Sequence, residues 1–437
     1  MASTRDVPYP LTRSSKPDVR SRRRTGRFAL IAMLTALAFG APPASAADGA
    51  LASPAAPLRA PYVPKADDEV LQEVPAASNP KVSAMETLRK KLDDDPANFG
   101  IATELARAYI DFGRELGDAH YAGYAEAVIA PWFARKQPPV AALVLQAVIL
   151  QYRHQFSDAR RLLKEALQRE PNDAQAWLTL ATLEMVQGEY AAANEACARV
   201  ARTGGFTLGL ACSGNLRSYL GEARQATGLL ALIEDKSPTQ SSSFRAWVEG
   251  LLAEAHERLG NWTDAEAHYR KGLKYEPNDN FLLVAYADFL LDRNRPKEVF
   301  DLLANYTQSD TAFLRIALAQ AALGSPDLQR YVWIMAARFE ALTQRGSDYY
   351  GREQVRFALH LQHDPKRALD LAQRNWQAQK APWDARVFLE AAQAANDPQS
   401  AVPVLTFLER TKLEDPIIEP LARDLRAKLG SAAGRTP

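Results

Sequence analysis

Residues 246–279 read AWVEGLLAEAHERLGNWTDAEAHYRKGLKYEPND, and this stretch of 34 residues decides the fold. Apolar residues recur at intervals of three or four on both sides of Gly260, which is the spacing of one face of an α-helix. Gly260 is placed to end the first helix in a left-handed conformation, and Pro277 stops the second helix before the next unit. The stretch therefore predicts a hairpin of two antiparallel helices.

The hairpin pattern recurs along the chain. Units begin at Val140 and Ala174, 34 residues apart, and again at Ala246 and Asn280 with the same interval. One hairpin cannot bury its own apolar face, so several hairpins must stack. Small residues are expected where the two helices of a hairpin cross, namely Ala181, Ala193, Ala253 and Ala265. Large residues are expected between neighbouring hairpins, namely Trp177, Tyr190, Trp262 and Tyr269.

These residues resemble the tetratricopeptide repeat (TPR) family, most clearly over residues 140–303. The resemblance implies an all-α fold, an α-solenoid (superhelix) of TPR-like helical hairpins. Residues 81–139 are expected to form divergent N-terminal helical hairpins. Residues 304–430 are expected to form degenerate helical repeats and a C-terminal cap. The chain also resembles uncharacterised exported proteobacterial TPR proteins.

Residues 1–46 have the layout of a secretory signal peptide. Arg22-Arg23-Arg24 is basic, residues 28–39 are an apolar run, and Ala44-Ser45-Ala46 offers a cleavage site. An apolar run of this length spans about 18 Å as a helix, short of the roughly 30 Å hydrocarbon core of a bilayer. We expect cleavage near Ala46, a periplasmic or secreted protein, and no membrane span after cleavage. An uncleaved anchor is the alternative. Residues 47–80, rich in Ala and Pro, predict an extended linker.

The charge of the chain is unevenly distributed. Residues 1–46 contain eight of the 53 Lys and Arg residues and two of the 52 Asp and Glu residues. The rest of the chain therefore has 45 basic and 50 acidic residues. Nucleic-acid binding needs a basic surface, so we expect no nucleic acid as the partner. The resemblance to TPR proteins implies another protein or a peptide segment instead.

Common motifs of catalysis are missing from the sequence, including His-Glu-x-x-His, Gly-x-Ser-x-Gly and Cys-x-x-Cys. A helix would place His360 and His363 on one face, where two imidazoles can bind a metal, but Asp364 would point elsewhere. His256 and His268 are expected to pack or to form surface hydrogen bonds. We therefore predict no enzyme, no metal site and no cofactor.

Cys197 and Cys212 are the two cysteines of the chain. Their midpoint falls between Gly204 and Gly205, at the expected turn between two antiparallel helices, so both side chains lie at similar heights. In an oxidising periplasm such a pair is often bridged. The alternative is two buried thiols that pack without a bond.

The resemblance to TPR proteins implies that the first helix of each hairpin lines a concave groove for a partner. Residues expected on this groove face are Tyr152, Leu178, Met185, Trp247, Glu254, Arg258, Phe281 and Asp288. The face is apolar in the first two units and mixed acidic and aromatic later, which suits an amphipathic helix or an extended peptide. A simple core role is the alternative for Leu178. The Lys and Asn residues with which some family members grip a terminal carboxylate are missing.

The sequence as a whole predicts an exported TPR scaffold or adaptor that mediates protein–protein interaction in the cell envelope. The alternative is a periplasmic chaperone or assembly factor that binds client proteins. One stoichiometric partner would favour the scaffold, and many unfolded clients would favour the chaperone.

Overall fold

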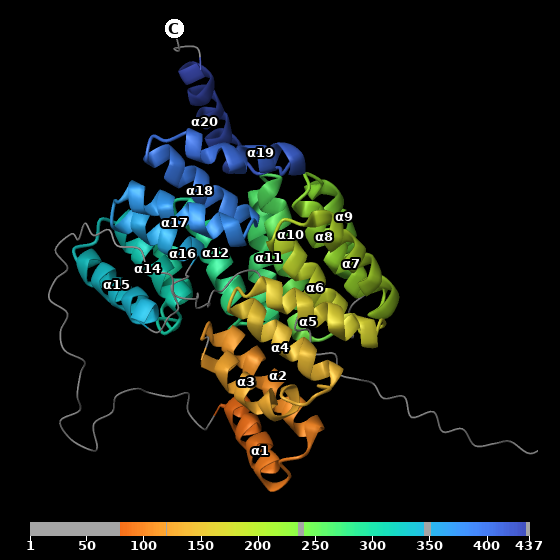
Figure 1. Ribbon diagram of the computed structural model, residues 1–437. Coiled ribbons are helices and arrows are strands. Elements are labelled where there is room, and N and C mark those ends of the chain that lie inside the picture. Colours follow the sequence, from red (N-terminus) through yellow and green to blue (C-terminus); the bar gives the residue numbers. More distant parts are fainter. Residues whose placement is uncertain (1–78, 119, 235–239, 345–350, 434–437) are drawn as a thin grey trace, which may run out of the picture. The chain divides into compact units, whose positions relative to one another are not determined.

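The structure is a computed structural model that describes residues 79–118, 120–234, 240–344 and 351–433. Every regular element in these ranges is helical, which confirms the predicted all-α class (Figure 1). In chain order they are α1 (Pro80–Asp94), α2 (Phe99–Leu116), α3 (His120–Phe133), α4 (Val140–Tyr152), α5 (Phe156–Arg169), α6 (Ala174–Val186), α7 (Tyr190–Thr203), α8 (Phe206–Ser218), α9 (Ala223–Glu234), α10 (Ser242–Arg258), α11 (Trp262–Tyr275), α12 (Asn280–Asp292), α13 (Pro296–Leu303), α14 (Asp310–Ala322), α15 (Leu328–Gln344), α16 (Gly351–Arg356), the π-helix η1 (Phe357–Leu361), α17 (Pro365–Ala378), α18 (Pro382–Ala394), the 3-10 helix η2 (Gln399–Ala401), α19 (Val402–Thr411) and α20 (Ile418–Ala433). The predicted signal peptide, residues 1–46, lies outside the described residues, and so does the predicted linker apart from Asn79 and Pro80.

In the described ranges, successive helices from α2 to α19 pair into nine hairpins, and each hairpin packs against the next. The first hairpin is α2 with α3 and the last is α18 with α19. In the eighth hairpin, α16 and η1 together form the first helix and α17 the second. This consecutive packing is the predicted solenoid of TPR-like hairpins, and it continues beyond residue 303, where the sequence shows no clear register.

The turn inside each hairpin contains a residue with positive φ. These residues are Gly117, His154, Gly188, Gly221, Gly260, Asn294, Gly324, His363 and Asn396. The predicted left-handed ends of the first helices at Gly188 and Gly260 are confirmed, with φ of 74° and 71°. His154 precedes Gly188 by one period, and Asn294 follows Gly260 by one period. The left-handed backbone conformation of the turn therefore recurs at the 34-residue interval even where the residue is not glycine.

The sequence Glu-Pro-Asn-Asp, at residues 170–173 and 276–279, explains how one hairpin ends and the next begins. The proline stops the preceding helix, and the final aspartate caps the following one. The side chain of Asp173 accepts a hydrogen bond from the backbone N of Ala176 at 2.8 Å. Asp279 accepts one from the backbone N of Leu282 at 3.1 Å. The same four residues thus set the start of α6 and of α12.

The small and large residues that the sequence places between helices are buried or half-buried. The four small residues expected at helix crossings, namely Ala181, Ala193, Ala253 and Ala265, are fully buried. Tyr190 and Tyr269 are buried and Trp177 and Trp262 half-buried. The Tyr269 ring of α11 stacks on the Tyr286 ring of α12, with centroids 5.6 Å apart, so it fills the space between two hairpins.

Candidate functional site

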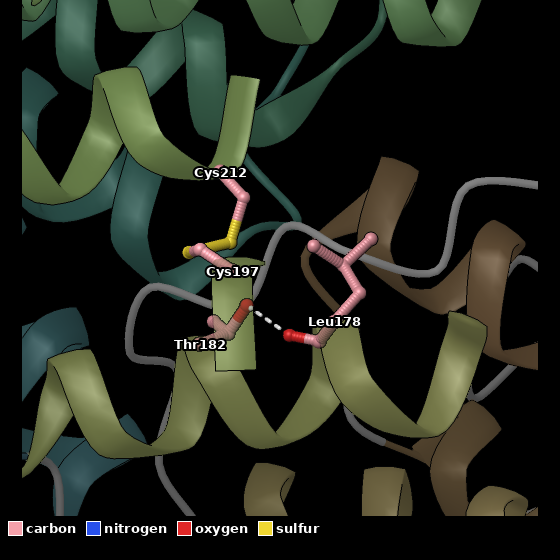
Figure 2. The surroundings of a disulfide bond; sticks show 4 residues. All are labelled: Leu178, Thr182, Cys197 and Cys212. Carbon is pink, nitrogen blue, oxygen red and sulfur yellow. Dashed lines mark hydrogen bonds between the residues drawn. A yellow bond between two sulfur atoms is a disulfide. The ribbon is translucent and has the colours of Figure 1, made fainter. Parts of the chain in front are cut away.

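Cys197 and Cys212 form a disulfide that joins α7 to α8, with Cα atoms 5.4 Å apart (Figure 2). Because α7 ends at Thr203 and α8 begins at Phe206, the cysteines lie at similar distances from the turn, as the sequence predicts. Both are buried. The disulfide therefore ties two consecutive hairpins together. Thr182 of α6, in the surroundings of the bond, donates a hydrogen bond to the Leu178 carbonyl at 3.0 Å (Figure 2).

The eight residues predicted for the groove face all lie on first helices of hairpins, but most are covered. Leu178, Met185, Trp247, Arg258 and Asp288 are buried, and Tyr152, Glu254 and Phe281 are half-buried. Contact between these residues and a partner stays a prediction. The three half-buried side chains are the members of the set that keep access to solvent.

The C-terminal ends of α4, α6, α8 and α12, with the residues that follow each, form what we call the hairpin-turn edge. The connection between α17 and α18 is distant from these helices in the sequence, and it packs on this edge. The backbone N of Lys380 donates to the carbonyl of Val186 at 2.7 Å, and Nε2 of Gln187 donates to the carbonyl of Ala378 at 3.2 Å. Nε2 of Gln379 lies 3.2 Å from Nδ1 of His154. Burial lowers the pKa of His154 to about 3, so its imidazole is neutral at pH 7.

Helix α19 extends the same contact along the edge. The Phe407 ring packs edge-on against the ring of Tyr190, with centroids 5.8 Å apart. A Cβ at Gly188 would lie 2.8 Å from Cε2 of Phe407, and a Cβ at Gly221 would overlap the carbonyl oxygen of Lys412. Two turns of the edge therefore lack the space for a side chain because the C-terminal hairpins cover them.

An ion pair connects α18 to α12 at the same edge. Nη1 and Nη2 of Arg386 each donate to a carboxylate oxygen of Asp292 at 2.6 Å, and Nε of Arg386 donates to Glu390 at 2.8 Å. Nε2 of His360 lies 3.6 Å from Glu390. Burial alone would raise the pKa of Glu390, but hydrogen bonding from His360 and the charge of Arg386 lower it to about 2. Nothing in the sequence indicated this ion pair, since 94 residues separate Arg386 from Asp292.

A second set of buried charges joins the first helices of hairpins six, seven and eight. Arg315 of α14 donates to both carboxylate oxygens of Asp288, at 3.0 and 2.8 Å, and to Glu353 of α16 at 2.5 Å. Arg356 also donates to Asp288, at 2.7 Å. Burial alone would raise the pKa of Asp288, but the charges of Arg315 and Arg356 hold it well below its ordinary value. Asp288, which the sequence predicts to contact a partner, forms ion pairs with two arginines of the same chain.

Charged residues of α10 gather near Tyr219, the residue that follows α8. The guanidinium of Arg258 lies 5.0 Å from the ring centroid of Tyr219 and donates to Glu254 at 3.3 Å. Glu257 has one carboxylate oxygen that is buried without a hydrogen-bond partner. Burial raises the pKa of Glu257 to about 8, so this side chain holds a proton at neutral pH.

Histidines of the described ranges contact rings, carboxylates and amides. No three His, Cys, Asp or Glu side chains gather to hold a metal ion in the part of the chain that the structure describes. His363 follows η1 with φ of 54°, so the expectation that it shares a helical face with His360 is wrong, because the helix ends before it. The imidazoles of His256 and His268 stack with centroids 5.2 Å apart, and Nδ1 of His268 lies 2.7 Å from Glu249, in agreement with a packing role.

A surface pocket of about 470 Å³ lies between α11, α12 and the start of α13. Its lining consists of Trp262, Thr263, Glu266, Ala267, Arg270, Phe289, Arg293 and Arg295. No helix within the described ranges is long and apolar enough to span a membrane.

Comparisons with known proteins agree with this repeat structure. The sequence has no match among the curated proteins compared. Among solved structures, the chain is similar to the Cut9–Hcn1 hetero-tetramer of the APC/C (11% identity, 82% of this chain and 91% of that chain, TM-score 0.37). It is also similar to yeast Tom70 (10% identity, 82% and 87%, TM-score 0.39). Because the identities and TM-scores are low, nothing about the partner of this chain follows from them. The tetratricopeptide repeat family matches residues 150–205, the segment that contains α5, the α6–α7 hairpin and Cys197.

Proposed function

We propose that this chain is an exported scaffold that binds another protein in the cell envelope. The observation behind the proposal is the buried Cys197–Cys212 disulfide, which joins two hairpins at one end of the segment that matches the TPR family. A repeat array presents an extended surface to a protein, and a structural disulfide suits an oxidising compartment. The two features together favour protein binding outside the cytosol.

The sequence before the first helix supports the export half of the proposal. Residues 1–46 have the basic, apolar and small-residue regions of a secretory signal, and the next residues are rich in Ala and Pro. The disulfide is an independent reason for the same compartment, because cytosolic thiols are kept reduced. Neither feature depends on the other.

The repeat structure supports the binding half. Each hairpin contacts mainly its neighbours, and such an array offers a long surface to a protein. The hairpin-turn edge at His154, Gly188 and Gly221 is covered by the C-terminal hairpins, which directs a partner to other surfaces. Phe281 of α12 is one of the half-buried side chains that a partner can still reach.

The experiment is site-specific photocrosslinking of the full chain in its native cells. A photoreactive phenylalanine analogue replaces Phe281, and a matched variant carries it at Phe313, which is buried. We expect one crosslinked protein at Phe281, none at Phe313, and a mature chain that begins just after Ala46 in the envelope fraction. A full-length chain that stays in the cytosol, or an array without any crosslinked protein, would overturn the proposal.

A further inference from the structure

The surface pocket between α11 and α12 contains a stacked arginine. The guanidinium carbon of Arg293 lies 3.9 Å from the ring centroid of Trp262, which is a cation–π contact. Nε of Arg293 is buried and has no hydrogen-bond partner. Among the described residues, no carboxylate lies within ion-pair distance of this guanidinium. A stacked guanidinium keeps its N–H groups at the ring edge, where a carboxylate can accept from two of them.

The neighbouring charges of the pocket already satisfy one another. Glu266 accepts hydrogen bonds from Arg270 at 2.7 Å and from Arg295 at 2.7 Å, and Arg295 also pairs with Glu298 at 2.6 Å. The pocket lining thus has three arginines and one glutamate. Hydrogen bonding from Arg295, aided by Arg270, lowers the pKa of Glu266 to about 2, which agrees with a locally positive field. Arg293 is the arginine of this lining that forms no ion pair among the described residues.

The rest of the lining is mostly apolar and partly accessible. Trp262 is half-buried, Thr263 and Ala267 are exposed, and Phe289 is buried. The pocket lies where two hairpin turns meet, and its lining comes only from α11 to α13 and their turns. The C-terminal hairpins, which cover other turns, contribute no lining residue here. This part of the surface is therefore open to a partner.

We propose that this pocket is a docking site for a partner protein segment that carries a carboxylate side chain next to an apolar one. The carboxylate pairs with Arg293, and the apolar side chain packs on the half-buried ring of Trp262. A single carboxylate matches the one guanidinium of the lining without an ion pair among the described residues, since Glu266 and Glu298 already pair with the other two arginines. This inference rests on the proposed binding function and names the partner chemistry and the site.

The test uses two fluorescein-labelled peptides and the full chain. One peptide presents Leu-Glu-Gln-Leu between Gly-Ser flanks, and its twin presents Leu-Gln-Gln-Leu. We expect fluorescence anisotropy to show at least about tenfold tighter binding of the acidic peptide, as for a charge-assisted pair. The variant Arg293→Gln should bind both peptides as weakly as the wild type binds the twin.

Two further variants separate the site from general charge or folding effects. Arg245 also lies 3.9 Å from an aromatic ring centroid, that of Tyr275, and is outside the pocket, so Arg245→Gln should bind like the wild type. Ala267→Glu adds a carboxylate at an exposed position of the lining and should abolish the preference for the acidic peptide. Equal binding of the two peptides by the wild type, or an unchanged preference in Arg293→Gln, would overturn the docking site.

The docking site and the proposed scaffold function can fail separately. A crosslinked partner that Arg293→Gln still captures at wild-type level would overturn the docking site and leave the scaffold intact. Failure of the wild type to capture any partner would overturn the scaffold, whatever the peptides show. Loss of the partner in Arg293→Gln, but not in Arg245→Gln, supports both.

Discussion

At Gly188 two constraints act on one residue. Its φ is 74°, and a Cβ would lie 2.8 Å from the Phe407 ring, whereas the nearest atom to a Cβ at Gly260 lies at 3.9 Å. We predict that Gly260→Ala costs about 1 kcal/mol through its left-handed backbone alone. Gly188→Ala should cost about 2–4 kcal/mol, because a clash with the covering helix is added. Urea unfolding of both variants measures the difference, and equal costs would show that α19 does not cover this turn.

Glu257 gives a pH dependence whose sign follows from its pKa. Burial raises this pKa from 4.5 to about 8, so the folded chain binds one more proton than the unfolded chain between these values. Its contribution to stability therefore falls as the pH rises from about 5 to 8. We predict that Glu257→Gln, which stays neutral, gains stability relative to the wild type over this range. Thermal unfolding at pH 5 and pH 8 is the measurement, and a constant difference between the two proteins would contradict it.

At the scale of helices, the disulfide restrains the α7–α8 pair. The cysteines are 15 residues apart, and closing a loop of about 15 residues contributes roughly 3 kcal/mol in the chain-entropy treatment. We predict that the double variant Cys197→Ala/Cys212→Ala loses about 2–4 kcal/mol of unfolding free energy. The wild type in reductant should approach the same value. Hydrogen exchange should rise first in α7 and α8, and a loss spread evenly over the chain would argue against a local restraint.

Hairpins could be predicted from the sequence where the 34-residue pattern is clear, and glycine marks the turn in two of these units. Gly188 and Gly260 are recognisable because glycine adopts positive φ at low cost. His154, Asn294 and Asn396 adopt the same backbone without that signature. The last two hairpins, which turn at His363 and Asn396, look irregular in sequence although their backbone turns repeat. Asn is the more readable substitute, since its short polar side chain tolerates the left-handed region.

At the scale of the whole chain, contacts between distant hairpins could not be predicted. The groove-face positions were those that the TPR resemblance implies, and they do lie on first helices. Their burial depends on partners such as Arg356 for Asp288, 68 residues away, and local spacing contains no information about such pairs. The same holds for Lys380 on Val186. The proximity of Cys197 and Cys212 was easier to predict, because the two residues flank one short turn.

The central claim is that the C-terminal hairpins pack on the hairpin-turn edge of earlier repeats, and hydrogen exchange of the full chain tests it most directly. Arg386→Ala removes the pair between α18 and Asp292 of α12, whereas Arg374→Ala removes an exposed pair within α17. We predict faster exchange in both α12 and α18 for Arg386→Ala, because breaking the pair leaves a half-buried carboxylate without its partner. Arg374→Ala should change α17 alone. Unchanged exchange of α12 in Arg386→Ala would contradict the account.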